Sequence, residues 1–233
     1  MFGAMFRNMP PVVKNLVIIN ALFFLATIVL EGRGINLYYY LGLFYIDSPF
    51  FKPYQLATHF FMHGGFFHLF FNMFALIVFG AHLERMWGPK RFLTFYFLTA
   101  IGASVLHMTV MWLEVYNLVG TAFPGYEEGM IVESAEMSHA WDIMKIPTVG
   151  ASGAIYGLIA AFAMLFPNTQ LMLLFPPIPI KAKWLALGLA ALAVYQGWKS
   201  ADGDSVAHFA HLGGMIFGFI IVKIWQRNKN NFY

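Results

Sequence analysis

The chain has 233 residues, of which 60% are hydrophobic and 11% are charged, with a formal net charge of +3 at pH 7. An average soluble domain has about 45–50% apolar and about 25% charged residues, so this composition excludes an ordinary soluble protein and indicates one that lies mostly in lipid. The small net charge gives no reason to propose nucleic acid as a partner, and the absence of cysteine excludes disulfides and thiolate sites.

Separated apolar runs divide the chain, and most are near the roughly 20 residues that a membrane-spanning helix needs. In chain order they cover residues 12–30, 56–81, 92–113, 149–166, 184–198 and 206–225. We therefore expect an all-α membrane protein with six transmembrane helices in a single domain over residues 1–233. The first run lacks the short apolar core and small-residue cleavage site of a signal peptide, so we expect it to be retained.

The positions of the charges predict the orientation, because lysine and arginine favour cytoplasmic segments close to helix ends. With both termini cytoplasmic, the inner side carries most of the basic residues: Arg7, Lys14, Arg85, Lys90, Arg91, Lys181, Lys183, Lys223, Arg227 and Lys229. Nearly all acids then lie outside, and every acid is interpreted as a loop or membrane-edge residue. A compact chain without a transit peptide favours a bacterial inner membrane.

Two of the predicted outer loops are long. Residues 31–54 are rich in aromatic side chains with few charges, which suits a segment partly embedded in the membrane interface. Residues 114–147 are rich in acids and glycine, so we expect them to be solvated and mobile. On the inner side, three prolines within residues 175–179 predict a turn that cannot be helical.

Strongly polar residues inside an apolar span are costly, so each one is a functional hypothesis. The second run holds His63, His68 and Asn72, and the last two are four residues apart on one face. The fourth run opens with Ser152, and the sixth contains His211. A serine and histidines inside membrane helices suggest hydrolysis within the membrane.

Small residues would bring the serine and the histidine together. Gly214 and Gly218 follow His211 on one face of the sixth run, and a second strip of small residues accompanies Ser152. Such strips let two helices approach closely, so we expect the serine Oγ to come within reach of the imidazole. Tyr156 lies four residues after the serine and is expected to pack against the base.

These residues supply the parts of an acyl-transfer site. A serine hydroxyl is a poor nucleophile until a base takes its proton, and neutral histidine is the usual base near pH 7. The N–H groups at the start of the fourth helix and the side chains of His68 and Asn72 can donate to a developing oxyanion. Because no acid is expected inside a helix, the predicted arrangement is a serine–histidine dyad.

Three motifs together resemble the rhomboid family of intramembrane serine proteases, over residues from about Pro53 to the end of the sixth helix. They are Gly150-x-Ser152-Gly153, Ala210-His211-x-x-Gly214-x-x-x-Gly218 and His63-x-x-x-x-His68-x-x-x-Asn72. The resemblance implies a rhomboid-like bundle with Ser152 as nucleophile and His211 as base. It also implies oxyanion donors from His68, Asn72 and the Ser152 N–H.

The resemblance further implies that the substrates are single-pass transmembrane proteins, cleaved in the bilayer within or just outside their spanning helix. No cofactor and no metal are expected. The supporting residues are His63, a structural residue near the outer end of the second helix, together with Gly150, Tyr156, Gly214 and Gly218.

Two other functions stay open from the sequence. A non-catalytic rhomboid-like binder of membrane helices would keep the fold without the chemistry, and a histidine-based metal transporter is the less favoured alternative. Zinc hydrolases would show His-Glu-x-x-His, which the chain lacks. His208 lies off the small-residue strip and is interpreted as a packing residue. We interpret the remaining histidines as interfacial or loop residues: His59, His82, His107 and His139.

Overall fold

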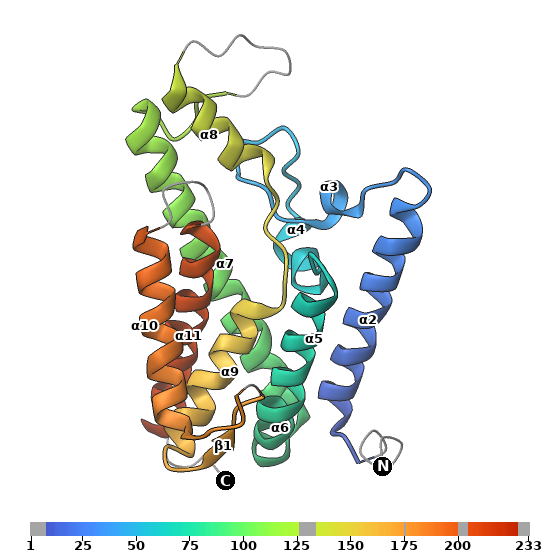
Figure 1. Cartoon of the computed structure of the whole chain (residues 1–233), viewed down its shortest axis with the longest axis vertical. Coiled ribbons are helices and arrows are strands. Elements are labelled where there is room, and N and C mark those ends of the chain that lie inside the picture. Colours follow the sequence, from blue (N-terminus) through green and yellow to red (C-terminus); the bar gives the residue numbers. More distant parts are fainter. Residues whose placement is uncertain (1–7, 126–133, 175, 200–204, 228–233) are drawn as a thin grey trace.

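The computed structural model describes residues 8–125, 134–174, 176–199 and 205–227. These residues form helices and one short antiparallel hairpin (Figure 1). The elements are α2 (Pro11–Glu31), α3 (Leu37–Leu41), α4 (Gln55–Thr58), η1 (His59–Phe61), α5 (Phe66–Ala75), η2 (Leu76–Gly80), α6 (Ala81–Trp87), α7 (Pro89–Val119), α8 (Ala135–Lys145), α9 (Ser152–Leu165), β1 (Gln170–Met172), β2 (Pro179–Lys181), α10 (Ala182–Lys199) and α11 (Ser205–Arg227).

Within the described residues, four helices are long and apolar enough to cross a membrane: Pro11–Glu31, Phe66–Trp87, Pro89–Val119 and His208–Arg227. The apolar helix α9 is shorter, with 14 residues and a length of about 21 Å. The helix α2 begins and α11 ends at the same end of the bundle (Figure 1). The chain is therefore a mostly helical, integral multi-pass membrane protein, and the number of six spans stays a prediction.

The second span differs from the prediction of one helix over residues 56–81. The short helices α4 and η1 come first, and α5 begins only at Phe66, directly after Gly64 and Gly65. Glycine costs roughly 1 kcal/mol per residue in a helix interior relative to alanine, so this pair favours a break. The span then runs through the π-helical η2 and α6 to Trp87. The placement of His63 on the second helix is wrong, because this residue lies in the non-helical stretch between η1 and α5.

One acid is buried, against the expectation that every acid lies in a loop or at a membrane edge. The side chain of Glu84, on α6, is 2% exposed. Its two carboxylate oxygens accept hydrogen bonds of 2.9 Å from the Val12 N–H and 2.8 Å from the Val13 N–H. These N–H groups lie in the first turn of α2 and have no partner within the helix. Glu84 therefore fixes the start of α2 against α6, far from the predicted site.

The part of the molecule formed by the end of α7 and by α8 is more ordered than its composition suggests. The 31 residues of α7 span about 46 Å, which exceeds the roughly 30 Å hydrocarbon core, so α7 projects beyond the membrane. The helix α8 packs against this projection through buried residues that include Trp141 and Met144. The prediction of a solvated and mobile segment is wrong for Ala135–Lys145, and residues 126–133 lie outside the described part.

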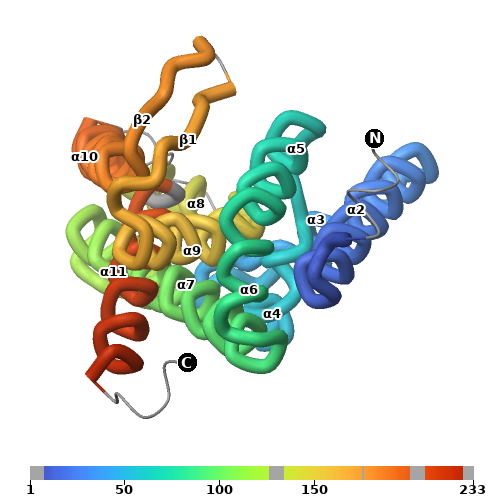
Figure 2. Tube along the Cα trace, turned by 90° about the horizontal axis from the view of Figure 1, so that it is seen from below, coloured from blue at the N-terminus to red at the C-terminus, as the bar shows by residue number. Residues whose placement is uncertain are grey.

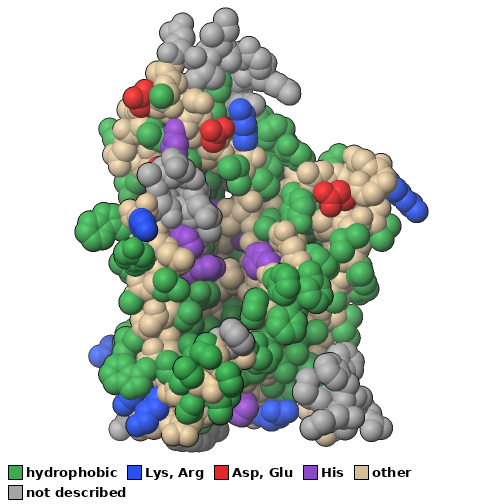
Figure 3. All heavy atoms as spheres, viewed as in Figure 1, with side chains coloured by type: hydrophobic (Ala, Val, Ile, Leu, Met, Phe, Trp, Pro, Cys, Tyr) green, Lys and Arg blue, Asp and Glu red, His purple; other side chains and the backbone are tan. Residues whose placement is uncertain are grey.

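The helix α9 occupies the centre of the bundle, between α5, α7, α10 and α11 (Figure 2). Most of its side chains are buried, from Ala154 to Ala163. The hairpin β1–β2 joins α9 to α10, with Gln170 opposite Lys181, so the proline-rich turn is non-helical as predicted. On the face drawn in Figure 3, acidic side chains lie at the upper end and several basic ones at the lower end, with an apolar band between them.

Candidate active site

Ser152 is the first residue of α9, and glycines on both sides of it allow close packing. Gly150 has a φ of 125°, which side chains other than glycine rarely adopt. A Cβ built on Gly150 would stand 2.8 Å from His68 Nε2, and one on Gly153 would stand 2.5 Å from the Ala103 Cβ on α7. The glycines of the Gly-x-Ser-Gly motif therefore let the backbone next to the serine pack against His68 at Gly150 and against α7 at Gly153.

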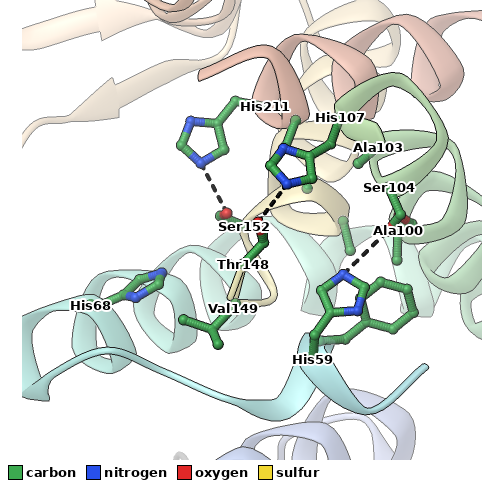
Figure 4. A pocket seen from close by; sticks show the side chains of 15 residues that line it. His59, His68, Ala100, Ala103, Ser104, His107, Thr148, Val149, Ser152 and His211 are labelled. Atoms are coloured by element: carbon green, nitrogen blue, oxygen red, sulfur yellow. Dashed lines mark hydrogen bonds between the residues drawn. The ribbon is translucent and has the colours of Figure 1, made fainter. Parts of the chain in front are cut away.

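His211 lies beside this serine. Its Nε2 is 2.9 Å from Ser152 Oγ, a hydrogen-bond distance (Figure 4). The two glycines that follow His211 permit this approach, since a Cβ on Gly214 would stand 1.9 Å from the Gly153 carbonyl oxygen. A Cβ on Gly218 would stand 2.7 Å from the Gly157 carbonyl oxygen. The backbones of α9 and α11 are thus in direct contact for more than one turn beyond the pair, from Gly153 and Gly214 to Gly157 and Gly218.

The ring of His211 is held on one face by Tyr156. The two ring centroids are 4.2 Å apart and the planes differ by 2°, so the rings are stacked in parallel. Within the described residues, no carboxylate forms an ion pair with His211. The arrangement of hydroxyl, imidazole and stacked tyrosine gives the imidazole a fixed orientation without an acid.

His68 faces the serine from α5. Its Nδ1 accepts a 3.3 Å hydrogen bond from the Gly64 N–H. A neutral imidazole whose Nδ1 accepts must carry its proton on Nε2, and this is the nitrogen that stands near Gly150. His68 is therefore oriented as a hydrogen-bond donor toward the space above the serine. Asn72 is buried one turn further along α5, and its amide donates a 3.0 Å hydrogen bond to the His68 carbonyl oxygen.

His63 supports this side of the site from the non-helical stretch before α5. Its ring meets the ring of His68 edge-on, with centroids 5.0 Å apart, and the Tyr38 hydroxyl donates a 2.9 Å hydrogen bond to its carbonyl oxygen. Burial, together with the nearby His68, lowers the pKa of His63 to about 4, so the ring is neutral at pH 7. The ring of His208 meets the ring of His211 edge-on, with centroids 6.3 Å apart.

Two histidines near the site were misread in the sequence. His59 and His107 are 4% and 2% exposed, so the interpretation as interfacial or loop residues is wrong for both. Together with Ser152 and His211 they line a cavity of about 160 Å³. The spacing of Ser104 and His107 indicates that their side chains lie on one face of a helix, because residues three apart share a helix face. His59 could not be placed from the sequence, because it lies on the separate short helix η1.

A larger cavity leads away from the dyad. It has a volume of about 870 Å³, and Ser152, His211 and Tyr156 line one part of it. Its walls come from α5 and α10, and residues 171–174 of the hairpin region close it further along. The wall on α5 carries the exposed phenylalanines Phe67, Phe70, Phe71 and Phe74, and the rings of Phe70 and Phe74 stack with a centroid distance of 6.3 Å. This apolar groove runs from the Ser152 hydroxyl along the exposed phenylalanines of α5.

The family model and the similar proteins found by comparison with known proteins all carry the same family name. A family model described as "Rhomboid domain" matches residues 51–228. The chain is 30% identical over 173 residues to "Rhomboid protein 1, mitochondrial" of Saccharomyces cerevisiae, covering 72% of this chain and 42% of that protein. It is 28% identical to "Rhomboid-like protein 16, chloroplastic" of Arabidopsis thaliana, covering 76% and 49%.

"Rhomboid-like protease 1" of Toxoplasma gondii is also similar, at 24% identity over 96% of this chain and 67% of that protein. The chain thus spans about half the length of the mitochondrial and chloroplastic relatives.

Proposed function

The chain belongs to the rhomboid family, and we propose that it is an intramembrane serine endopeptidase that cleaves single-pass transmembrane proteins. The observation that carries this proposal is the 2.9 Å contact between Ser152 Oγ and His211 Nε2 inside a helical bundle. A nucleophile and its base within hydrogen-bond reach are the minimum for covalent acyl transfer.

The first half of the reaction forms an acyl-enzyme. His211 Nε2 takes the hydroxyl proton as Ser152 Oγ bonds to the scissile carbonyl carbon, and the carbonyl oxygen becomes an oxyanion. The Ser152 N–H at the start of α9, the His68 Nε2–H and an Asn72 amide N–H are the proposed donors to that oxyanion. When the tetrahedral intermediate collapses, the C–N bond breaks and His211 gives its proton to the leaving amine.

The second half releases the acyl group with water. His211 removes a proton from a water molecule that attacks the ester, and the proton then returns to Ser152 Oγ as the C–O bond breaks. The stacked Tyr156 ring keeps the imidazole in one orientation through both halves. A dyad is sufficient here because packing, in place of a carboxylate, orients the base.

The groove between α5 and α10 suggests how a substrate reaches the serine. A membrane helix could enter it from the lipid, with its apolar side chains against the phenylalanines of α5. The scissile bond must leave its helix first, because intact helical backbone groups are already hydrogen-bonded and shielded. We therefore expect preferred substrates to contain glycine, proline or other weak helix formers near the outer face of the membrane.

The topology belongs to the same proposal. Six spans in one membrane domain over residues 1–233, with both termini cytoplasmic, would place Ser152 near the outer side. The location in a bacterial inner membrane stays a prediction, because the named relatives include a mitochondrial and a chloroplastic protein.

A cleavage assay tests the proposed reaction. The purified protein is placed in liposomes with a panel of tagged single-pass proteins, and the products are mapped by mass spectrometry. We expect cuts within or just outside the spanning segment, and none with the Ser152→Ala variant. Binding of the substrates without any cut would favour the non-catalytic binder instead.

A further inference from the structure

The position of Ser152 depends on the six residues that precede it. Residues 146–151 form no helix and no strand of the hairpin, although they connect α8 directly to the serine at the start of α9. Such a segment has no internal hydrogen-bond ladder, so its position must be fixed from outside. The contacts of this connecting segment therefore control where the nucleophile stands.

The backbone of the connecting segment is anchored twice. Thr148 pairs with Leu43 of the long outer loop, with N···O distances of 2.8 and 2.9 Å in the two directions. The Gly150 N–H donates a 2.9 Å hydrogen bond to the carbonyl oxygen of His59. Both partners belong to segments between α2 and α5 that contain only short helices, so neither provides a rigid reference by itself.

A third anchor comes from a rigid element. The Thr148 hydroxyl is hydrogen-bonded to Nε2 of His107, which lies on the long helix α7 (Figure 4). His107 is 2% exposed, and one turn earlier the Ser104 hydroxyl contacts His59 Nε2 at 3.2 Å. The helix α7 packs against both α9 and α11, the helices that carry the dyad. The His107–Thr148 hydrogen bond therefore ties the connecting segment to the same helix that supports Ser152 and His211.

We propose that His107 is a positioning residue for the nucleophile, acting through the Thr148 hydroxyl. This inference rests on the proposed protease function. His107 lines the same cavity as Ser152, and its proposed effect is to hold the connecting segment in register with α7. If the bond is lost, the half-buried hydroxyl must find another partner, which favours a shift of the segment. A misplacement of about 1 Å at a nucleophile can cost about 10²-fold in rate.

Matched substitutions separate the hydrogen bond from packing. In His107→Gln, the terminal amide lies as many bonds from Cβ as Nε2 does, and it can donate or accept. His107→Leu fills similar space without a polar atom. On the other side of the bond, Thr148→Ser keeps the hydroxyl and Thr148→Val removes it at nearly constant shape. Thermal unfolding of each variant shows whether it is folded.

Two rates report on the nucleophile. The first is the second-order rate constant for modification of Ser152 by a fluorophosphonate, which needs no substrate. The second is kcat, measured apart from KM, for a cleaved transmembrane protein. We expect His107→Leu and Thr148→Val to lower the modification rate and kcat by about 10-fold to 100-fold with little change in KM.

We further expect His107→Gln and Thr148→Ser to restore most of the rate, and the His107→Leu/Thr148→Val double variant to be no slower than the slower single variant. The inference is overturned if the wild type reacts at Ser152 and His107→Leu reacts equally fast, or if His107→Gln does not rescue the loss. If His107→Leu is unfolded, the comparison of Thr148→Val with Thr148→Ser replaces it. Equal rates of Ser152 modification in wild type and Thr148→Val, or no rescue by Thr148→Ser, then overturn the inference. An unreactive Ser152 in the wild type would instead contradict the proposed function.

Discussion

At the scale of single residues, two histidines on the same end of α11 compete for the role of base. A general base must come within about 2.6–3.2 Å of the proton that it abstracts. His211 Nε2 meets this condition at 2.9 Å from Ser152 Oγ, whereas the contact found for His208 is an edge-on one to the ring of His211. The geometry therefore favours His211, in agreement with its position on the glycine strip.

Alanine substitutions test this choice. Ser152→Ala and His211→Ala should both abolish cleavage, since each removes one half of the dyad. His208→Ala should retain much of the activity, because it removes a neighbour of the base and leaves the hydrogen bond in place. Initial cleavage rates in liposomes measure the effect, with thermal unfolding as a control for folding. An active His211→Ala and an inactive His208→Ala would assign the base to the other histidine.

At the level of helices, the proposed dyad requires the close contact between α9 and α11. Gly214→Val should inactivate the enzyme although no reacting group is changed. A Cβ at this position would already stand 1.9 Å from the Gly153 carbonyl oxygen, so the two backbones must separate. Separation by about 1 Å can cost about 10²-fold in rate. Cleavage by a folded Gly214→Val protein at the wild-type rate would show that this contact does not set the distance between Ser152 and His211.

A glycine in open space provides the matched control. Gly188 lies on α10, and a Cβ built there meets nothing within 4 Å. Gly188→Ala should leave cleavage unchanged and stabilise the helix by up to about 1 kcal/mol, because alanine has the higher helix propensity. The same cleavage assay, with thermal unfolding beside it, compares the two glycines. A similar loss of activity in both variants would indicate a general effect of glycine replacement.

An element can be predicted from the sequence when the interactions that form it join residues close together in the chain. The lengths of the apolar runs indicate where the long helices lie, and the spacing of small residues indicates that Gly214 and Gly218 face another helix, because both signals are local in the sequence. The break before α5, the packing of α8 and the burial of Glu84 depend on partners far away in the chain. Val12 and Glu84 are 72 residues apart, and nothing near either one indicates the contact.

The residues of the candidate site were also predictable only where the signal is local in the sequence. Ser152, His211, His68 and Asn72 could be grouped because each is a polar residue within an apolar run. The sequence did not indicate that His107 would meet Thr148, since they are 41 residues apart and a lone histidine in a helix carries no sign of its partner. Residues that position a nucleophile are therefore harder to predict than the nucleophile itself.

At the scale of the whole molecule, the proposed orientation can be tested directly, because the chain contains no cysteine. Single cysteines can be introduced at exposed positions on either side, at Lys90 at the start of α7 and at Ser138 on α8. In intact spheroplasts that express the protein, a membrane-impermeant maleimide should label Ser138→Cys. Lys90→Cys should be labelled only after the membrane is permeabilised. The reverse pattern would invert the topology.

The central claim is that Ser152 is a nucleophile activated by His211. The measurement that tests it most directly is peptide mapping after the purified protein is treated with a fluorophosphonate, since only an activated serine should react. We expect one adduct, on Ser152, in the wild-type protein and none in a folded His211→Ala variant. An unmodified Ser152 in the wild type, or equal modification of Ser152 in both proteins, would show that His211 does not activate this serine.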